Sequence, residues 1–524
     1  MTGTDSRVVM LGFDAMDPVL TRQLISAGRM PAFARLLEES AQRPTRNPPG
    51  LFVGSLWSTF FTGQTAIETG FHCWEEIVPG GYERRETTAA SIRGTPFWET
   101  LSQAGRRVAV VDVPHSRAGT PLNGVQISEW GCHDRHFGLR THPPELAEEL
   151  VARYGIHPVL SVDPFVEGDW APDDYVFREG RLRTIDEERQ LLAGLLVGAD
   201  AKRQMSVDLL ADGPWDVFLS VFGETHSVGH QAWHLHDPAH PRFDWRAREA
   251  VGDPVVQVYE KMDEVLAAHL AAIDEDATLL VLLSHGMAAH YDGTHLLPEV
   301  LRRLDGVYGS LSLGRSRTGR SLSAAWDAMP ARLRDASRRP LAALLRRHRG
   351  QRELKPLPEY ETPEQRQTQA FFMSPNNYVV GGVRFNLVGR EAAGRVQPGR
   401  ELDELRARLE ADLLALVNVE TGTSVITRVE RSDEHYQRDA LDSLPDLFLH
   451  WNKDHLIETV WSPRFGMIGG EYTHWRSGDH RPEGLLLERS PGTTPDAELP
   501  PVAINQLGAV ISAQLGVELE SVPS

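Results

Sequence analysis

With 524 residues, the chain is too long for one ordinary core and fits one large α/β domain with a smaller companion. Its content of 41% hydrophobic and 24% charged residues is typical of a globular protein and not of a disordered one. Its net charge of -19 argues against general nucleic-acid binding and against an anionic membrane surface. Cys73 and Cys132, the only cysteines, cannot build a disulfide framework or a cysteine-rich zinc site, so we expect any metal to be held by other side chains.

Four apolar segments are predicted to be strands, at residues 7–13, 108–113, 215–222 and 277–283. They do not alternate with polar residues, which is typical of strands covered on both faces. Helical patterns lie between them, for example at 31–39 and 255–273. This order predicts an α/β fold with a doubly wound, mostly parallel sheet and helices on both faces. Such sheets place their functional sites at the carboxyl ends of the strands.

Potential metal ligands follow or flank several of these strands. His226 and His230 come just after the third segment, and their spacing of one helical turn lets both imidazoles face one point. Asp14 and His285 follow two other segments, and His480 precedes the apolar run 485–487. In a chain with 21 histidines a solvated helix face or a core histidine is the alternative for any one of them. The repeated order of strand and ligand favours a metalloenzyme.

Residues 301–370 contain an arginine-rich segment in which acidic residues nearly vanish between about 302 and 352. Serine, glycine and proline interrupt it, so we interpret it as an inserted arm or lid with a helix around residues 341–345. Two roles are open. The segment is either a solvated insertion or a basic flap that attracts an anionic substrate or covers a partner subunit.

Several short motifs occur in the order found in one superfamily: GFD at 12–14, WSTFFTG at 57–63, GFH at 70–72, VDVP at 111–114, VRFNLVGR at 383–390, VQPG at 396–399, LPDL at 444–447 and GDHRPEG at 478–484. With these motifs the chain resembles the alkaline phosphatase superfamily, in particular its type I phosphodiesterase/nucleotide pyrophosphatase branch. The resemblance implies an alkaline phosphatase-like core at 1–300, the arginine-rich insertion at 301–370, a smaller α/β cap at 371–446, and a return to the core at 447–524. It also implies a two-metal hydrolase that transfers a phosphoryl or sulfuryl group through a threonine or serine nucleophile.

For the first metal, the resemblance implies an aspartate and two histidines as ligands. His226 stands in place of the aspartate, and His230 and His480 are retained, which gives three histidines. Three neutral imidazoles leave a divalent ion with its full charge, so its bound water should be more acidic. Zinc is the metal that fits this set best, with iron and manganese as alternatives.

For the second metal, the resemblance implies two aspartates and a histidine. Asp14 and His285 are present, but Ser284 replaces the second carboxylate. A serine hydroxyl is a far poorer ligand for a divalent ion. The sequence therefore leaves open whether one ion or two bind, and His285 is an acid/base candidate if it is not a ligand.

The expected nucleophile position is occupied by Val53, which has no nucleophilic atom. Either the loop is remodelled so that Ser55 takes this role, or no covalent intermediate forms. The alternative role for Ser55 is that of a helix N-cap. Arg476 and Arg481, near His480, are candidates for binding substrate oxygens, with ordinary surface arginines as the alternative.

Our leading hypothesis is a divergent metal-dependent hydrolase that acts on a phosphate ester, a phosphodiester or a related anionic ester. A second hypothesis is a mononuclear three-histidine enzyme with lyase, isomerase or other non-phosphoryl activity. A third is a non-catalytic binding protein. We expect a small anionic substrate, no nucleic-acid or membrane partner and a cytoplasmic location, and a homo-oligomer is not excluded.

Overall fold

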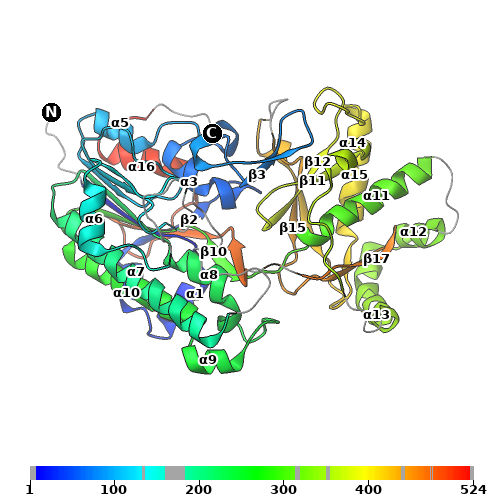
Figure 1. The fold of residues 1–524 in the computed structure, drawn as a ribbon, viewed down its shortest axis with the longest axis horizontal. Helices are drawn as coiled ribbons and strands as arrows, with labels where there is room; N and C mark the ends of the chain where they lie inside the picture. Colours follow the sequence, from blue (N-terminus) through cyan, green and yellow to red (C-terminus); the bar gives the residue numbers. More distant parts are fainter. Residues whose placement is uncertain are drawn as a thin grey trace.

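The larger lobe of the protein contains a nine-stranded mixed sheet (Figure 1). The computed structural model describes residues 7–132, 136–159, 183–312, 319–349, 354–437, 443–472, 474 and 476–519. The strands of the sheet, in spatial order, are β20 (Val502–Ala503), β2 (Ala41–Arg46), β19 (Gly484–Arg489), β9 (Thr278–Leu283), β1 (Val8–Phe13), β8 (Val217–Phe222), β5 (Val108–Val111), β6 (Gly124–Ser128) and β7 (Arg140–His142).

The register of the central strands brings three chain segments to one edge of the sheet. β1 pairs in parallel with both β8 and β9, so Phe13 lies opposite Phe222 and Leu283. The residues that follow these three strands therefore emerge side by side. β19 runs antiparallel to β9 and begins at Gly484, so the segment that leads into it reaches the same edge.

Alternate residues of β1 pack into two different cores, one on each face of the sheet. Val9, Leu11 and Phe13 belong to one core, whereas Val8 and Met10 belong to the other. The first face is covered by α2 (Pro31–Glu39), α7 (Ile185–Ala211) and α10 (Pro254–Ala272), and the second by α3 (Phe52–Thr62), α5 (Phe97–Gln103) and α16 (Leu507–Gln514). Figure 1 shows α7 and α10 on one side of the sheet and α3, α5 and α16 on the other. The predicted doubly wound, mostly parallel α/β sheet is confirmed.

The smaller lobe is built on a four-stranded antiparallel sheet with the order β11 (Phe371–Ser374), β12 (Val380–Phe385), β15 (Leu447–Trp451) and β14 (Ile426–Arg431). Beside it lies a three-stranded sheet of β13 (Val417–Asn418), β16 (Thr459–Ser462) and β17 (Gly466–Gly469). The core of this lobe also takes residues from α11 (Leu297–Ser312) and α15 (Arg400–Leu414). Residues on both sides of 371–446 thus share this core, and the domain boundaries stay a prediction.

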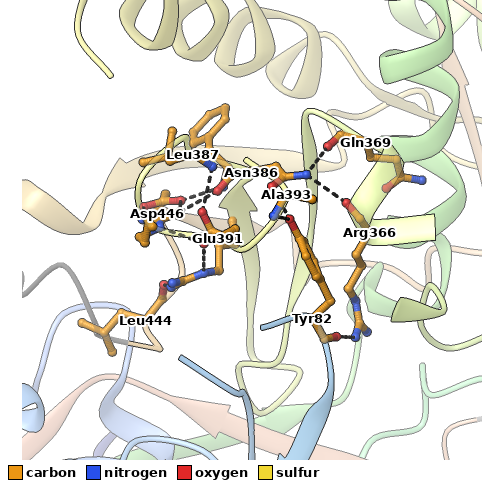
Figure 2. Close-up of polar contacts among 12 residues, drawn as sticks. Tyr82, Arg366, Gln369, Asn386, Leu387, Glu391, Ala393, Leu444 and Asp446 are labelled. Atoms are coloured by element: carbon orange, nitrogen blue, oxygen red, sulfur yellow. Dashed lines mark hydrogen bonds and ion pairs between the residues drawn. The ribbon is translucent and has the colours of Figure 1, made fainter. Parts of the chain in front are cut away.

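A buried polar network fixes the smaller lobe to a loop of the larger one (Figure 2). The loop joins β3 (Glu75–Ile77) to β4 (Arg84–Glu86) and contains Tyr82, whose hydroxyl donates to Asn386 Oδ1 at 2.8 Å. Asn386 in turn donates to the carbonyl of Gln369 at 2.8 Å. Arg390 forms an ion pair with Asp446 at 2.7 Å. Asn386 and Arg390 therefore have structural partners inside the lobe.

The arginine-rich insertion forms α12 (Gly319–Ala328) and α13 (Ala331–Arg349), and the helix expected around residues 341–345 lies within α13. Arg346 donates to the carbonyl of Val419 at 3.1 Å, and Arg349 pairs with Glu420. These contacts hold α13 against the smaller lobe. In Figure 1 both helices lie at the far end of that lobe, away from α8 (Glu224–His236), so α12 and α13 do not cover the site-bearing edge.

The other elements are short or lie at the periphery of the two lobes: α1 (Pro18–Ser26), α4 (Ala66–Thr69), α6 (Leu146–Tyr154), α9 (Trp245–Val251), α14 (Pro363–Thr368), β10 (Gly286–Ala289) and β18 (Gly478–Arg481). β10 and β18 form an antiparallel pair of their own. Within the described part of the chain, no helix combines the length and the apolar character needed to cross a membrane.

Candidate metal centre

Three buried histidines converge at the carboxyl edge of the large sheet. α8 begins directly after β8 and carries His226 and His230 one turn apart. β18 carries His480 and pairs with β10, which places His480 opposite Met287. One ring nitrogen from each histidine lies within 4.8 Å of the other two. The spacing seen in the sequence thus produces a compact set of imidazole donors.

Hydrogen bonds made by Nδ1 fix the orientation of two of these rings and so the direction of their Nε2 atoms. His226 Nδ1 lies 2.7 Å from Asp14 Oδ2, and His230 Nδ1 lies 2.8 Å from the carbonyl oxygen of Gly478. A carboxylate and a carbonyl are acceptors, so we assign the Nδ1–H tautomer to both neutral rings. Their Nε2 atoms are 3.0 Å apart. Two lone pairs that face each other at this distance are stabilised by a cation or a proton between them.

The third ring provides a matching donor. His480 is 1% exposed, and its Nδ1 is buried without a hydrogen-bond partner in the described part of the chain. Burial, followed by the charges of the neighbouring histidines, lowers the pKa of His480 well below its ordinary value. A neutral imidazole is the form that binds a metal. The set fits a divalent ion that accepts nitrogen ligands, of which zinc is the commonest.

Asp14 lies behind His226, on its Nδ1 side. Besides the contact with His226, its carboxylate accepts hydrogen bonds from Trp57 Nε1 and Ser284 Oγ, both at 3.0 Å. Burial raises the pKa of Asp14, but His226 and the other donors outweigh burial and hold the pKa below its ordinary value. A carboxylate that receives the second ring N–H of a ligating histidine orients that ring. The structure therefore gives Asp14 the position of an orienting partner.

His285 lies beside the cluster without joining it. Its Nε2 is 3.6 Å from Asp14 Oδ1, and its ring centroid is 4.3 Å from that of His480. Burial lowers the pKa of His285 to about 4. The hydroxyl of Ser284 donates a hydrogen bond to Asp14. Among the residues that the structure describes, no third ligand therefore joins Asp14 and His285 to complete a second ion site.

Ser55 is separated from this chemistry by its place in α3. The side chain is 0% exposed, and its hydroxyl donates to the carbonyl of Leu51 at 2.9 Å. The helix begins at Phe52 with Leu51 as its N-cap, so the alternative role of Ser55 as an N-cap is wrong. As a nucleophile Ser55 stays a prediction, for which this buried and bonded hydroxyl gives no support.

The two arginines predicted to bind substrate oxygens lie in different places. Arg476 lies at the cluster, with one guanidinium nitrogen 3.3 Å from His230 Nε2. Arg481 follows His480 directly in β18 and so points to the opposite face of the strand. There it lines a separate cavity of about 580 Å³ together with Lys453. The structure brings Arg476, and not Arg481, to the three histidines.

One further histidine near the site was not predicted from the sequence. His115 follows β5 with a left-handed backbone (φ 62°), and its Nδ1 lies 3.3 Å from His136 Nε2. Burial lowers the pKa of His115 to about 3, and the charges of Asp14 and His226 also act on it. The sequence contained a signal for His115, because this residue follows a predicted strand just as Asp14 does.

A comparison with protein-family models identifies the family of the chain. The model described as "Type I phosphodiesterase / nucleotide pyrophosphatase" matches residues 8–480, so the chain belongs to this family. The resemblance seen in the motifs is confirmed. No curated protein sequence matches at a significant level.

Solved structures provide distant matches that cover nearly the whole chain. Phosphonoacetate hydrolase from Sinorhizobium meliloti, in complex with phosphonoformate, is 14% identical with a TM-score of 0.48, over 98% of this chain and 96% of that one. Murine ectonucleotide pyrophosphatase/phosphodiesterase 5 is 11% identical with a TM-score of 0.46, over 99% and 98% of the two chains. The human form of the latter is 10% identical with a TM-score of 0.45, over 99% and 97%.

The position of Asp14 behind His226 leads to a prediction about metal affinity. We expect Asp14→Asn to weaken metal binding by about 10- to 100-fold, because the ring of His226 loses its charged orienting partner. Competition against a chelator of known affinity measures the change. Asp274→Asn, at an exposed aspartate, is the matched control. Complete loss of the ion would instead indicate that Asp14 is itself a ligand, and an unchanged affinity would show that it orients nothing.

Proposed function

We propose that the protein is a hydrolase with one divalent ion held by His226, His230 and His480, acting on a phosphate ester, a phosphodiester or a related anionic ester. The observation that carries this proposal is the pair of Nε2 atoms facing each other at 3.0 Å, with His480 beside them. Zinc is the ion we propose first, with iron and manganese as alternatives. When bound, such an ion supplies Lewis acidity and makes a water molecule more acidic.

The residues around the cluster would divide the remaining tasks. Asp14 and the carbonyl of Gly478 hold two imidazoles in fixed tautomers. Arg476 offers a cation beside His230 for an anionic group of the substrate. His285 would supply a neutral imidazole next to His480, with the two ring centroids 4.3 Å apart, as a group that holds a proton. A water nucleophile fits this arrangement better than Ser55, whose hydroxyl is bonded within α3.

A second candidate function keeps the three-histidine site and changes the reaction to lyase, isomerase or other non-phosphoryl chemistry. Two substitutions favour it. Val53 occupies the position where the family resemblance implies a nucleophile, and Ser284 occupies that of a carboxylate ligand. A protein that holds one ion but hydrolyses no phosphate or related ester would support this candidate. A protein that holds no ion would support a binding role.

Metal content and one substitution test the proposal together. We expect elemental analysis of untagged protein to give one ion per chain, and Ser55→Ala to change the turnover of a broad phosphate-ester and diester panel by less than about twofold. Two ions per chain, with turnover abolished by Ser55→Ala, would overturn the proposal in favour of a two-metal mechanism with a covalent intermediate.

A small anionic substrate, a cytoplasmic location and the absence of nucleic-acid and membrane partners remain part of the proposal.

A further inference from the structure

A cavity of about 580 Å³ lies beside β18, on the side of the strand to which Arg481 points, and none of the three histidines lines it. Its wall combines residues 47–50 of the larger lobe with Trp451 and Lys453 of the smaller one. Ligand pockets in proteins have volumes of about 300–1,000 Å³, so this cavity is large enough for a small molecule.

Two positively charged side chains meet in this cavity without an acidic partner. Arg481 and Lys453 both line it, and neither forms an ion pair with a carboxylate in the part of the chain that the structure describes. Nη1 of Arg481 is buried and has no acceptor among the described residues. Lys453 Nζ donates to the carbonyl of His480 at 3.2 Å, next to Arg481 in the chain. The cavity therefore presents two neighbouring cations whose charge no described contact neutralises.

The acidic side chains around the two cations already have partners or lie in solvent. Asp292 and Asp479 both contact His290 Nε2, at 2.9 and 3.1 Å. Glu430, which lines the cavity, contacts His450 Nε2 at 2.6 Å. An anionic ligand can therefore bind the two cations without displacing a buried ion pair. The other acids that act on either cation are Asp17, whose carboxylate caps α1, and the exposed Asp454 and Glu483.

The two charges repel each other in the free protein. Burial, followed by the charge of Arg481, lowers the pKa of Lys453 to about 7. Burial also lowers the pKa of Arg481, although Asp479 and Glu483 act in the opposite direction. Cations that leave water without a counter-ion are unfavourable, and such groups gather at functional sites where a ligand supplies the missing contact.

We propose that this cavity binds a phosphate group, as the free ion or as part of a small organic phosphate, between Arg481 and Lys453 and separately from the metal centre. The planar guanidinium of Arg481 can donate two parallel hydrogen bonds to phosphate oxygens, and the ammonium of Lys453 adds a compact charge. Phe52, Val380 and Trp451 provide an apolar wall for an organic part. The site does not depend on the proposed function, because none of the three histidines lines the cavity.

Titration of metal-free protein tests this site without any contribution from a metal ion. After treatment with a chelator, we expect isothermal titration near pH 7, in about 0.15 M sodium chloride, to show a single inorganic phosphate bound per chain. Arg481→Gln and Lys453→Gln should each weaken this binding by at least about tenfold, because each removes a charge-assisted contact. Arg476→Gln, which removes the cation beside His230, is the control that should leave the affinity unchanged.

Thermal unfolding gives a second readout, which a purely structural role of Arg481 would not produce. Phosphate should raise the Tm of the wild type, because it binds the folded protein, and should leave the Tm of Arg481→Gln unchanged. Without phosphate, Arg481→Gln should unfold at the temperature of the wild type or above it, because the substitution removes a cation that has no partner. Glycerol 3-phosphate distinguishes the two sources of the phosphate group. Tighter binding than that of phosphate supports an organic phosphate, and equal binding supports the free ion.

Two results would overturn the phosphate site. The first is metal-free protein that shows no saturable binding of phosphate. The second is binding that Arg481→Gln retains and Arg476→Gln abolishes, which would place the phosphate at the metal centre instead. If Lys453→Gln does not fold, Arg481→Lys replaces it, with an expected loss of about tenfold because the two parallel hydrogen bonds are lost. None of these outcomes alters the expected metal content or hydrolysis, so the proposed function is tested separately.

Discussion

Protein with the substitution His226→Ala should lose its metal ion and its activity together. Two imidazoles, and an Asp14 carboxylate without its His226 partner, would remain where three nitrogen donors now converge. We expect the metal content to fall from one ion per chain to less than about a tenth, and turnover to fall by about 10³-fold, since a catalytic ion contributes several kcal/mol of transition-state stabilisation. Elemental analysis and steady-state assays on the same preparation measure both.

A control on the same helix separates ligand loss from helix damage. His236 lies at the end of α8, and its Nδ1 contacts Asp253 at 2.9 Å, outside the cluster. His236→Ala should keep the ion and the activity. If His226→Ala keeps a full complement of metal while His236→Ala loses it, the ligand assignment fails. Loss of activity in His226→Ala with the metal retained would instead make His226 a substrate-binding or acid/base residue.

The residues that reach the metal centre were predictable because they follow from strand order and helical spacing. Apolar runs without alternation indicated strands buried on both faces, and parallel pairing of β1 with β8 and β9 brings the following residues to one edge. His226 and His230 then share one face of α8 because they are one turn apart. These rules depend on backbone geometry, so one sequence is enough to apply them.

The roles of individual side chains were less predictable, because they depend on contacts between distant segments. No sequence spacing indicates that Asp14 accepts hydrogen bonds from His226, Trp57 and Ser284 and so lies behind a ligand. Nor does sequence proximity to His480 distinguish Arg476 from Arg481, since the first precedes β18 and the second points to its opposite face. The cavity of about 230 Å³ lined by Trp74, Tyr360 and Tyr378 is likewise formed by segments about 300 residues apart, which no sequence spacing indicates.

Lys202→Met should strongly destabilise the larger lobe. Lys202 comes from α7, is 0% exposed, and has its Nζ 2.7 Å from Asp112 Oδ2. Burial lowers the pKa of Lys202, but Asp112 and then Glu224 outweigh burial and raise it, so the amine stays charged. Without this cation two carboxylates would remain buried below the strand ends. We expect the free energy of unfolding to fall by about 3–5 kcal/mol.

Urea unfolding of the wild type, Lys202→Met and the double variant Asp112→Asn/Lys202→Met measures this effect and its cause. Asparagine tolerates the left-handed backbone of residue 112 (φ 52°) and still accepts a hydrogen bond from the backbone N–H of Trp130 or Gly131, so the double variant should be more stable than Lys202→Met. A loss below about 1 kcal/mol for Lys202→Met would mean that water solvates the carboxylates or that a proton neutralises one of them. Because Glu224 opens α8, loosening this network should also weaken metal binding at His226 and His230, which links the buried ion pair to the candidate site.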